Sequence, residues 1–306
     1  MKIINGLDAN KAHGYDGISI KMVKICSRAI AKPLCIIFKN CLNEGIFPNI
    51  WKKANVVPIH KKGDKRIISN YRPISLLPIF GKIFERIIYN RCFEFLMSNS
   101  LINTSQSGFI PRDSCINQLL SITHNIYSAF DANPTLEVKG VFLDISKAFD
   151  RVWHDGLIYK LNRMGINGNL KSLLESFLSD RYQRVVLNGQ SSDWAKINAG
   201  VPQGSILAPM LFLVYINDIT EELSSDIKLF ADDTSIFSVV HNPESTGQDL
   251  NRDLILIKNW GFQWKMDFNP DPTKPAKSIL FSRKVNAVCH PEIYYNENPI
   301  QQTNSH

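Results

Sequence analysis

Three acidic residues stand at the ends of apolar, strand-like runs, where carboxylates are poorly solvated. Asp144 follows the apolar residues 141–143, and Asp232 with Asp233 interrupts a β-rich stretch over residues 227–240. Because acids at the ends of buried strands need a compensating cation, the pattern favours a site for hard divalent metal ions. Two Mg²⁺ ions held by such carboxylates would serve an in-line phosphoryl transfer. On spacing alone, a solvated acidic turn and a helix N-cap at Asp144 explain the same residues.

Two further segments could bind phosphates or a nucleotide. The turn over residues 200–205 (GVPQGS) has glycines that allow close backbone approach and a glutamine that can hydrogen-bond a sugar or a base. A basic stretch beside a predicted strand could neutralise a triphosphate or a nucleic-acid backbone. It comprises Lys61, Lys62, Lys65, Arg66 and Arg72. Taken alone, the turn is only the start of a helix and the basic stretch only a solvated face.

The composition is that of an ordinary folded protein with a basic charge. The 306 residues are 44% hydrophobic, 21% charged and 10% aromatic, which excludes a disordered or fibrous chain and predicts one large domain or two fused ones. Lys and Arg number 35 against 28 acids, so the formal charge is +7, and with a pI of about 9.0 polyanions are the natural class of partner. The six cysteines show no metal or disulfide spacing and predict reduced, mostly buried thiols. With no secretory signal and no apolar run of about 20 residues, we expect a soluble, intracellular protein without a membrane span, in a nuclear or cytoplasmic compartment that the sequence does not decide.

Helical and strand-like patterns alternate irregularly, which predicts an α+β fold rather than a doubly wound sheet. Apolar residues at helical spacing predict two helices over residues 18–44 divided at Pro33, a helix over 78–97, and another to about residue 130 that is capped by Asp113. Further expected elements are strands at 54–59, 138–145 and 278–282, and hairpins at 182–199 and 227–240. Two helices are expected between residues 154 and 179, and one each at 205–219 and 246–266. We expect Asp232 and Asp233 to form the hairpin turn. The tail after Lys284 is expected to contain no new complete unit.

Together, these segments resemble the motifs of non-LTR (LINE, jockey-like) retrotransposon reverse transcriptases, in the order and spacing of that family. Residues 141–150 (VFLDISKAFD) resemble motif A, 200–209 (GVPQGSILAP) motif B and 230–233 (FADD) motif C. Further matches between about residues 10 and 300 are 12–17 (AHGYDG), 70–77 (NYRPISLL), 106–109 (QSGF), 264–266 with Asn269 and Pro270 in motif D, and 279–282 in motif E. The resemblance implies an RNA-directed DNA polymerase with right-hand fingers and palm, whose antiparallel palm sheet is backed by helices.

The resemblance also implies roles for individual residues. Asp144, Asp232 and Asp233 would be the catalytic acids that hold two Mg²⁺ ions, with Mn²⁺ as a second option, and the carbonyl of Ile145 would complete the metal shell. Lys274 would be the motif D lysine that protonates pyrophosphate, with Lys277 as its competitor. Phe149 would crowd a ribose 2′-hydroxyl and favour deoxynucleotides, and Gly204 would leave room for the template base. The implied nucleotide-binding residues are Lys62, Arg66, Arg72, Phe149, Gln203 and Gly204.

The implied partners are an RNA template, a DNA primer and a dNTP that the primer 3′-hydroxyl attacks. We expect residues 1–50 to be a helical extension of the fingers, 51–284 the fingers and palm, and 285–306 the start of the connection to a thumb. The thumb, and the endonuclease of full-length elements, are expected to be missing. Ile110 departs from the family pattern, since many relatives have arginine after Gln-x-Gly-Phe. The alternative function is a catalytically silent nucleic-acid-binding remnant, whereas Phe149 and the FADD motif disfavour an RNA-dependent RNA polymerase.

Overall fold

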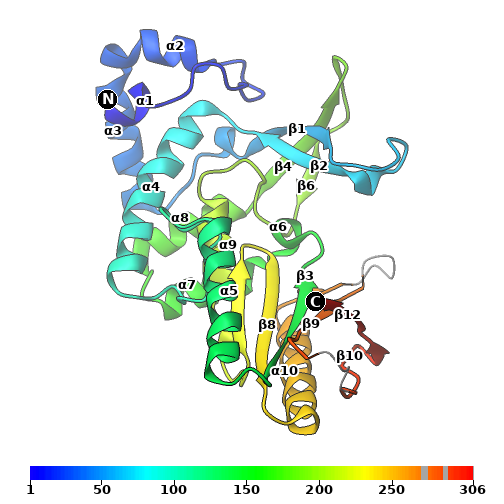
Figure 1. The fold of residues 1–306 in the computed structure, drawn as a ribbon. Helices are drawn as coiled ribbons and strands as arrows, with labels where there is room; N and C mark the ends of the chain where they lie inside the picture. The colour runs from blue at the N-terminus through cyan, green and yellow to red at the C-terminus, as the bar shows by residue number, and fades with distance from the viewer. Residues whose placement is uncertain (270–274, 285–288, 306) are drawn as a thin grey trace. The chain divides into compact units, whose positions relative to one another are not determined.

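The computed structural model describes residues 1–269, 275–284 and 289–305, and the chain divides into two compact units (Figure 1). Unit 1 comprises Met1–Leu101 and Phe149–Tyr215, and unit 2 comprises Ile102–Ala148 and Ile216–His306. Each unit is therefore built from two stretches of sequence. The expected division at residues 50 and 284 stays a prediction about family architecture.

The helices of unit 1 pack around a group of aromatic rings. The rings of Phe38 and Phe84 stack at a centroid distance of 4.7 Å, and Phe47 meets Phe177 edge-on at 5.1 Å. Aromatic pairs of this kind stabilise a fold by about 0.5–1.5 kcal/mol beyond their burial. Phe47 also stacks on Phe84 at 5.7 Å, so these rings join α3, α4 and α8 into one core. The helices are α1 (Lys2–Asn5), α2 (Ile20–Ile25), α3 (Ser27–Glu44), α4 (Ile79–Ser98), α6 (Ala148–Arg151), α7 (His154–Arg163), α8 (Gly168–Leu178) and α9 (Ala208–Ile216), with 3₁₀ turns η1 (Asn49–Trp51) and η2 (Ile68–Asn70).

The predicted division of the first helices at Pro33 is wrong. The chain bends at Cys26, between α2 and α3, and Pro33 lies inside α3 with its ring exposed. A proline inside a helix costs about 3 kcal/mol. Burial of Leu34 and Phe38 on the inner face of α3, at about 1.5–3 kcal/mol each, offsets that cost.

Unit 1 contains a mixed sheet in the strand order β2-β1-β4-β5, with β6 also paired to β4. Strand β1 runs antiparallel to β2 and parallel to β4, which brings two segments far apart in sequence side by side. The pairing of β4 with β6 confirms the hairpin predicted over residues 182–199. The strands are β1 (Lys53–His60), β2 (Tyr71–Leu76), β4 (Arg181–Leu187), β5 (Gln190–Ser191) and β6 (Ala195–Ile197).

Unit 2 is built on a five-stranded sheet in the order β12-β9-β3-β8-β7. All its pairs are antiparallel except β12 with β9. After Lys284, where no new complete unit is predicted, the chain adds the edge strand β12, whose polar residues give only a weak strand pattern. The strands are β3 (Glu137–Asp144), β7 (Asp226–Phe230), β8 (Asp233–Val240), β9 (Lys277–Phe281) and β12 (Gln301–Ser305), beside a small hairpin of β10 (Tyr294–Tyr295) and β11 (Asn298–Pro299).

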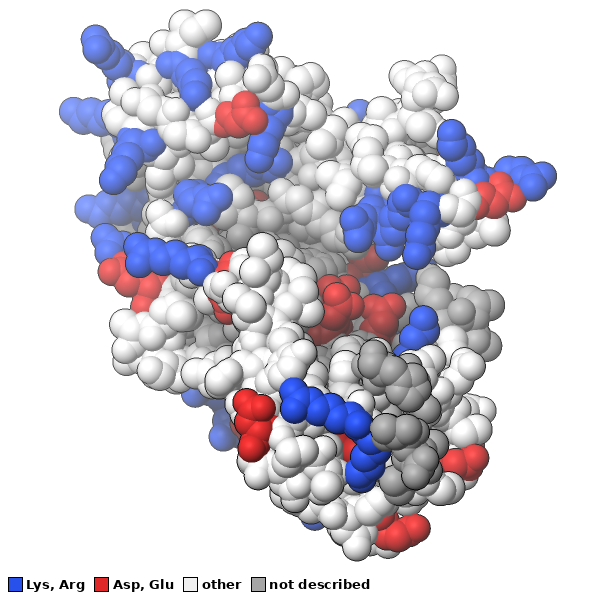
Figure 2. All heavy atoms as spheres, in the orientation of Figure 1, with Lys and Arg blue, Asp and Glu red and all other residues white. Residues whose placement is uncertain are grey.

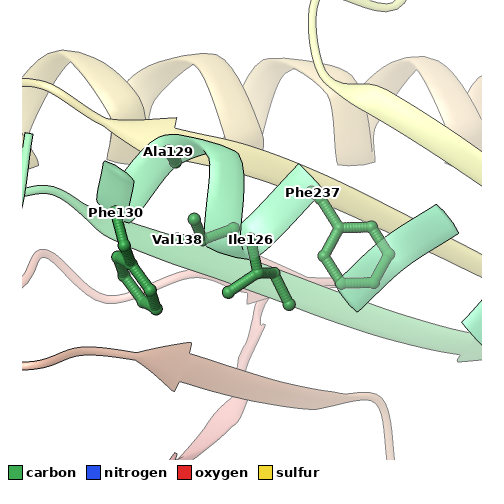
Figure 3. Packing of buried hydrophobic residues seen from close by; sticks show 5 residues of the cluster. All are labelled: Ile126, Ala129, Phe130, Val138 and Phe237. Carbon is green, nitrogen blue, oxygen red and sulfur yellow. The ribbon is translucent and has the colours of Figure 1, made fainter. Parts of the chain in front are cut away.

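Two helices, α5 (Cys115–Ala132) and α10 (Pro243–Gln263), cover opposite faces of this sheet (Figures 1 and 3). Ile126, Ala129 and Phe130 of α5 pack on Val138 and Phe237 of β3 and β8 (Figure 3). Because strand side chains alternate, the residues next to Val138 on β3 and next to Phe237 on β8 point to the opposite face, which α10 covers. The result is the predicted α+β fold, with a largely antiparallel sheet backed by helices.

Two predicted helix starts need correction. Ser114, not Asp113, caps α5, because its side chain accepts a hydrogen bond from the backbone of Asn117 while Asp113 accepts one from Ser114. Helix α9 begins at Ala208 rather than residue 205 and is continued by the 3₁₀ turn η3 (Asn217–Thr220). Among the described residues, no helix combines the length and apolar character needed to cross a bilayer.

The prediction that the cysteines are mostly buried is wrong. Two are buried, Cys41 and Cys92, and four are exposed, Cys26, Cys35, Cys115 and Cys289.

Candidate active site

Unit 2 brings the predicted acids together at one end of its central strands. Asp144, the last residue of β3, is the register partner of Asp233, the first residue of β8. Paired residues of antiparallel strands carry their side chains on the same face, with Cα atoms about 4.5–5.5 Å apart. Asp232 precedes Asp233 in the adjoining turn. All three acids thus lie at the same end of the sheet.

These acids disfavour one another's charge. The pKa of Asp233 is raised above its ordinary value, first by partial burial and then by the negative charges of Asp232 and Asp144. Like charges directly opposite in a sheet are destabilising, so a cation bound there would stabilise this end of the sheet. Across the described residues, no group of three or more His, Cys, Asp or Glu side chains is already arranged to hold a metal. The acids therefore fit a divalent cation in charge and oxygen-donor chemistry, without being preassembled around it.

The turn between β7 and β8 consists of Ala231 and Asp232, not of Asp232 and Asp233 as predicted. Phe230 pairs with Asp233, so Asp233 is already a strand residue. Ala231 adopts a φ of 57°, in the left-handed region that costs a residue with a side chain roughly 1–2 kcal/mol. Contacts from outside the hairpin must therefore hold this turn.

The segment over residues 105–108 supplies those contacts. Gln106 is 5% exposed, and its Oε1 accepts hydrogen bonds from the backbone N–H groups of Gly108 at 2.7 Å and Ala231 at 3.0 Å. Gly108 lies so close to the turn that a Cβ there would stand 2.1 Å from the backbone nitrogen of Ala231. Sequence reasoning did not assign this role, and the signal available was the glycine of QSGF, a residue that permits such an approach.

Asn269 holds the other side of the site. Its Oδ1 accepts from the backbone of Asp144 at 3.1 Å, and its own N–H donates to the Asp144 carbonyl at 2.9 Å. Ser146 donates to the Asp267 carbonyl at 3.0 Å, so the bonds lie on either side of Ile145. The carbonyl of Ile145 therefore takes no part in this bridge.

Of the two candidate motif D lysines, only Lys277 lies among the described residues. Lys274 lies outside the described residues. Lys277 is an exposed residue that begins β9 and is the register partner of Phe142, two residues before Asp144. Of the two, Lys277 is thus placed on the strand adjacent to the one that carries Asp144.

Unit 1 brings together residues 149–152 and 200–203. The backbone of Gly200 donates to the Val152 carbonyl at 2.8 Å, and the Gln203 side chain donates to Asp150 Oδ1 at 3.0 Å. Gly200 has a φ of 85°, and a Cβ there would stand 2.7 Å from the Asp150 carbonyl oxygen. Only glycine fits this crossing, so the two predicted nucleotide-binding segments have a fixed relation.

The ring of Phe149 is fixed by packing. It stacks on the buried Phe212 with a centroid distance of 4.9 Å and an interplanar angle of 17°. Its carbonyl accepts from the Val201 backbone at 2.7 Å. Phe149 is half-buried, so one part of the side chain is packed and another faces solvent.

Gly204 crosses strand β2 at close range. The carbonyl of Gln203 accepts from the Ser75 backbone at 2.7 Å, and a Cβ on Gly204 would stand 2.5 Å from the Ser75 carbonyl oxygen. The φ of Gly204 is 121°, which also favours glycine. The glycine is therefore required by the fold itself, in addition to any role toward a template.

A buried carboxylate that the sequence did not point to anchors the residues that follow. Glu85 of α4 is 1% exposed, and its Oε2 accepts from Ser205 Oγ at 2.6 Å, from the Ile206 backbone at 2.7 Å and from the Leu207 backbone at 3.3 Å. The buried Arg181 supplies an opposite charge, and burial lowers its pKa to about 10 against the raising effect of Glu85. An acid within a helical pattern predicts an exposed side chain, so no signal in the sequence marks Glu85 as buried.

The three predicted triphosphate-binding cations lie at the β1–β2 end of unit 1. Lys62, Arg66 and Arg72 are all exposed, and Figure 2 shows Lys and Arg side chains gathered around the β1–β2 turn. Arg66 is paired with Asp64, with Nη2 and Oδ2 2.7 Å apart. Solvent screens such an exposed pair, so an incoming polyanion can compete for Arg66.

Comparison with known proteins gives concordant results. Residues 59–286 match the family described as "Reverse transcriptase (RNA-dependent DNA polymerase)". The chain is 34% identical over 278 residues to "RNA-directed DNA polymerase from mobile element jockey" of Drosophila melanogaster, covering 88% of this chain and 30% of that protein. It is 30% identical over 302 residues to "Probable RNA-directed DNA polymerase from transposon X-element" of the same species, covering 97% of this chain and 32% of the relative. The chain thus spans about a third of the length of these relatives.

Among solved structures, the fold is similar to an apo telomerase from Candida tropicalis, truncated from its C-terminal domain. The TM-score is 0.56 at 12% sequence identity, and the match covers 84% of this chain and 56% of the other. At that identity the similarity supports the fold alone.

Proposed function

The chain belongs to the reverse transcriptase family, and from this premise we propose that it adds deoxynucleotides to a primer 3′-hydroxyl on an RNA template. In this proposal the sheet of unit 2 is the palm, and unit 1 supplies the fingers. The observation that carries it is the register pairing of Asp144 with Asp233, beside Asp232, at the end of the central strands. The names of the relatives, polymerases of non-LTR mobile elements, support the same chemistry. The expected lack of a thumb and of an endonuclease stays a prediction.

Asp144, Asp232 and Asp233 would hold the divalent cations, with the Ile145 carbonyl as a further oxygen donor. Two Mg²⁺ ions, when bound, supply activation of the primer hydroxyl and charge stabilisation for the departing pyrophosphate. Mn²⁺ has similar oxygen-ligand preferences. The support for this assignment is the mutual repulsion of the acids, which raises the pKa of Asp233 and which a cation would relieve.

The residues of unit 1 would bind and select the nucleotide. Phe149, held against Phe212, would present a fixed ring in the space that a 2′-hydroxyl needs. Gln203 donates its amide to Asp150, which orients its Oε1 to accept a hydrogen bond from the nucleotide. Gly204 would leave room for the template base.

Charged side chains would complete the reaction site. Lys62, Arg66 and Arg72 would neutralise the triphosphate. Either Lys274 or Lys277 would donate a proton to the leaving pyrophosphate.

A primer-extension assay tests the proposal. The wild-type chain and the double variant Asp232→Asn, Asp233→Asn are compared on a poly(rA)/oligo(dT) duplex with dTTP and Mg²⁺, and duplex binding is measured in parallel. We expect extension by the wild type alone, with similar duplex binding by both. Binding without extension by the wild type would refute polymerase activity and leave the nucleic-acid-binding remnant.

A further inference from the structure

Two cationic side chains share one indole ring in unit 1. The guanidinium carbon of Arg184 lies 4.7 Å from the ring centroid of Trp194, and Lys53 Nζ lies 5.4 Å from it. Tyr15, from the AHGYDG segment, meets the same ring edge-on at 5.7 Å, and its hydroxyl donates to the Ile50 carbonyl at 2.7 Å. The indole is therefore a braced platform for two positive charges, each within 5.4 Å of the ring centroid.

The guanidinium of Arg184 is oriented as well as stacked. Its Nε donates to Asn55 Oδ1 at 2.9 Å, and Asn55 is its register partner on the neighbouring strand. With Nε bonded to Asn55 and Cζ held over the indole, the two terminal nitrogens form a positioned pair of donors. Such a fork matches the oxygen atoms of a phosphate.

Neither cation has an acidic partner in the described part of the chain. No ion pair joins Arg184 or Lys53 to a described carboxylate, and Asp180, at the end of the same sheet, is paired with Lys196 at 2.8 Å. Two neighbouring like charges repel each other in the free protein. A polyanion would remove that repulsion, whereas a neutral or cationic partner would not.

The pair shares a sheet face with a predicted nucleotide-binding residue. Arg184 is paired with Asn55 and Arg72 with Ile59, two positions of the same parity on β1. Strand side chains alternate, so Arg72 and Arg184 lie on one face, about 13 Å apart along the strand at roughly 3.3 Å per residue. A row of cations at this spacing suits one strand of nucleic acid, which presents phosphates repeatedly.

We propose that Arg184 and Lys53, braced on Trp194, form a backbone-phosphate site for single-stranded RNA. The identification of that strand as the template rests on the proposed polymerase function, whereas the phosphate chemistry does not. Aromatic side chains and cations together are the usual means of binding single strands without sequence preference. Tyr15 and Asn55 are positioning residues in this site.

Binding of a fluorescent single-stranded RNA oligonucleotide, followed by anisotropy from 50 to 300 mM salt, tests the site. Each phosphate contact on a single strand contributes about 0.7 to the slope of log affinity against log salt, so the double variant Arg184→Gln, Lys53→Gln should lower the slope by about 1.4. The matched control Arg28→Gln, Lys39→Gln removes the same charges from exposed positions on α3 and should leave the slope unchanged. Trp194→Leu should weaken binding without any change in charge. Urea unfolding midpoints establish that each variant is folded.

The outcomes separate this site from the polymerase proposal. Equal slope losses in the two double variants, or an unchanged slope in the first, would overturn the site. Primer extension by the wild type with no slope change in the variant would refute the site alone. If only the Arg184→Gln, Lys53→Gln variant loses slope and the wild type extends no primer, the site is supported and the polymerase function is refuted.

Discussion

Replacing Gly108 by alanine perturbs the turn that carries Asp232 without touching an acid. The added Cβ would stand 2.1 Å from the backbone nitrogen of Ala231 and 2.8 Å from the carbonyl carbon of Phe230. Both atoms belong to the main chain of the β7–β8 hairpin, so no side chain can rotate away. The segment carrying Gly108 and the hairpin must separate.

The size of the effect follows from these distances. Ordinary contact begins at 3.4 Å, so the shift is at least 3.4 minus 2.1, or 1.3 Å. Overpacking of a buried site costs about 1–3 kcal/mol, and losing the bond from Ala231 to Gln106 adds about 1 kcal/mol. We expect a loss of about 2–4 kcal/mol in the free energy of unfolding. A displacement of about 1 Å at a reacting centre can lower the rate about 100-fold.

Urea unfolding and single-nucleotide addition at saturating duplex and dNTP measure the two effects. Gly6→Ala is the matched control, because its Cβ would meet only ordinary contacts at 3.5 and 3.7 Å. We expect Gly6→Ala to stay within about 0.5 kcal/mol of the wild type, as tolerated substitutions do. If Gly108→Ala is equally stable and equally active, the hairpin is not held by this approach and the reasoning is wrong.

Three further predictions concern individual residues. Because the pKa of Asp233 is raised in the fold, its ionised carboxylate destabilises the metal-free protein at a pH above that pKa. Asp233→Asn should therefore raise the metal-free Tm at neutral pH, and this gain in Tm should shrink as the pH falls toward 3.8, the ordinary pKa. A gain that grows as the pH falls would contradict this. Phe149→Ala should lower the ratio of kcat/KM for dNTP over rNTP, and a change of less than about twofold, or about 0.4 kcal/mol, would contradict the role of a gate. Glu85→Ala should cost about 3–5 kcal/mol of unfolding free energy, because it leaves the Ser205 hydroxyl and the Ile206 N–H without their acceptor and the buried Arg181 without a compensating negative charge. A loss no larger than that of the exposed control Glu44→Ala would refute the anchor.

The elements with strong periodicity could be predicted from sequence, and their boundaries less well. The apolar run of α4 and the β-rich runs of β3 and β8 are long enough for their patterns to identify them. The bend at Cys26 and the start of α9 were predicted at the wrong residues, because tertiary burial and side-chain caps determine where these helices begin and end. Strand β12 has no apolar alternation and gains its place by pairing with β9.

The acids of the candidate site were identifiable because charge at the end of an apolar strand is unusual. The residues that hold them were not, since each acts through contacts between distant segments. Asn269 reaches Asp144, and Gln106 reaches Ala231, across 125 positions in each case. A pattern in one sequence carries no distance information across such a separation.

The β7–β8 turn in unit 2 and the segment at residues 205–207 in unit 1 are anchored in the same way, which local stability alone does not explain. A single oxygen, Gln106 Oε1 in unit 2 or Glu85 Oε2 in unit 1, gathers donors of the loop beside it. Each anchor brings a cost, since Gln106 Nε2 and two nitrogens of Arg181 are buried without a hydrogen-bond partner among the described residues. An unsatisfied buried donor costs about 1–3 kcal/mol, and an apolar residue would avoid that cost. What an apolar residue cannot do is fix a turn whose backbone is strained at Ala231, and the proposed metal and nucleotide sites would need that fixed geometry more than the protein needs the lost stability.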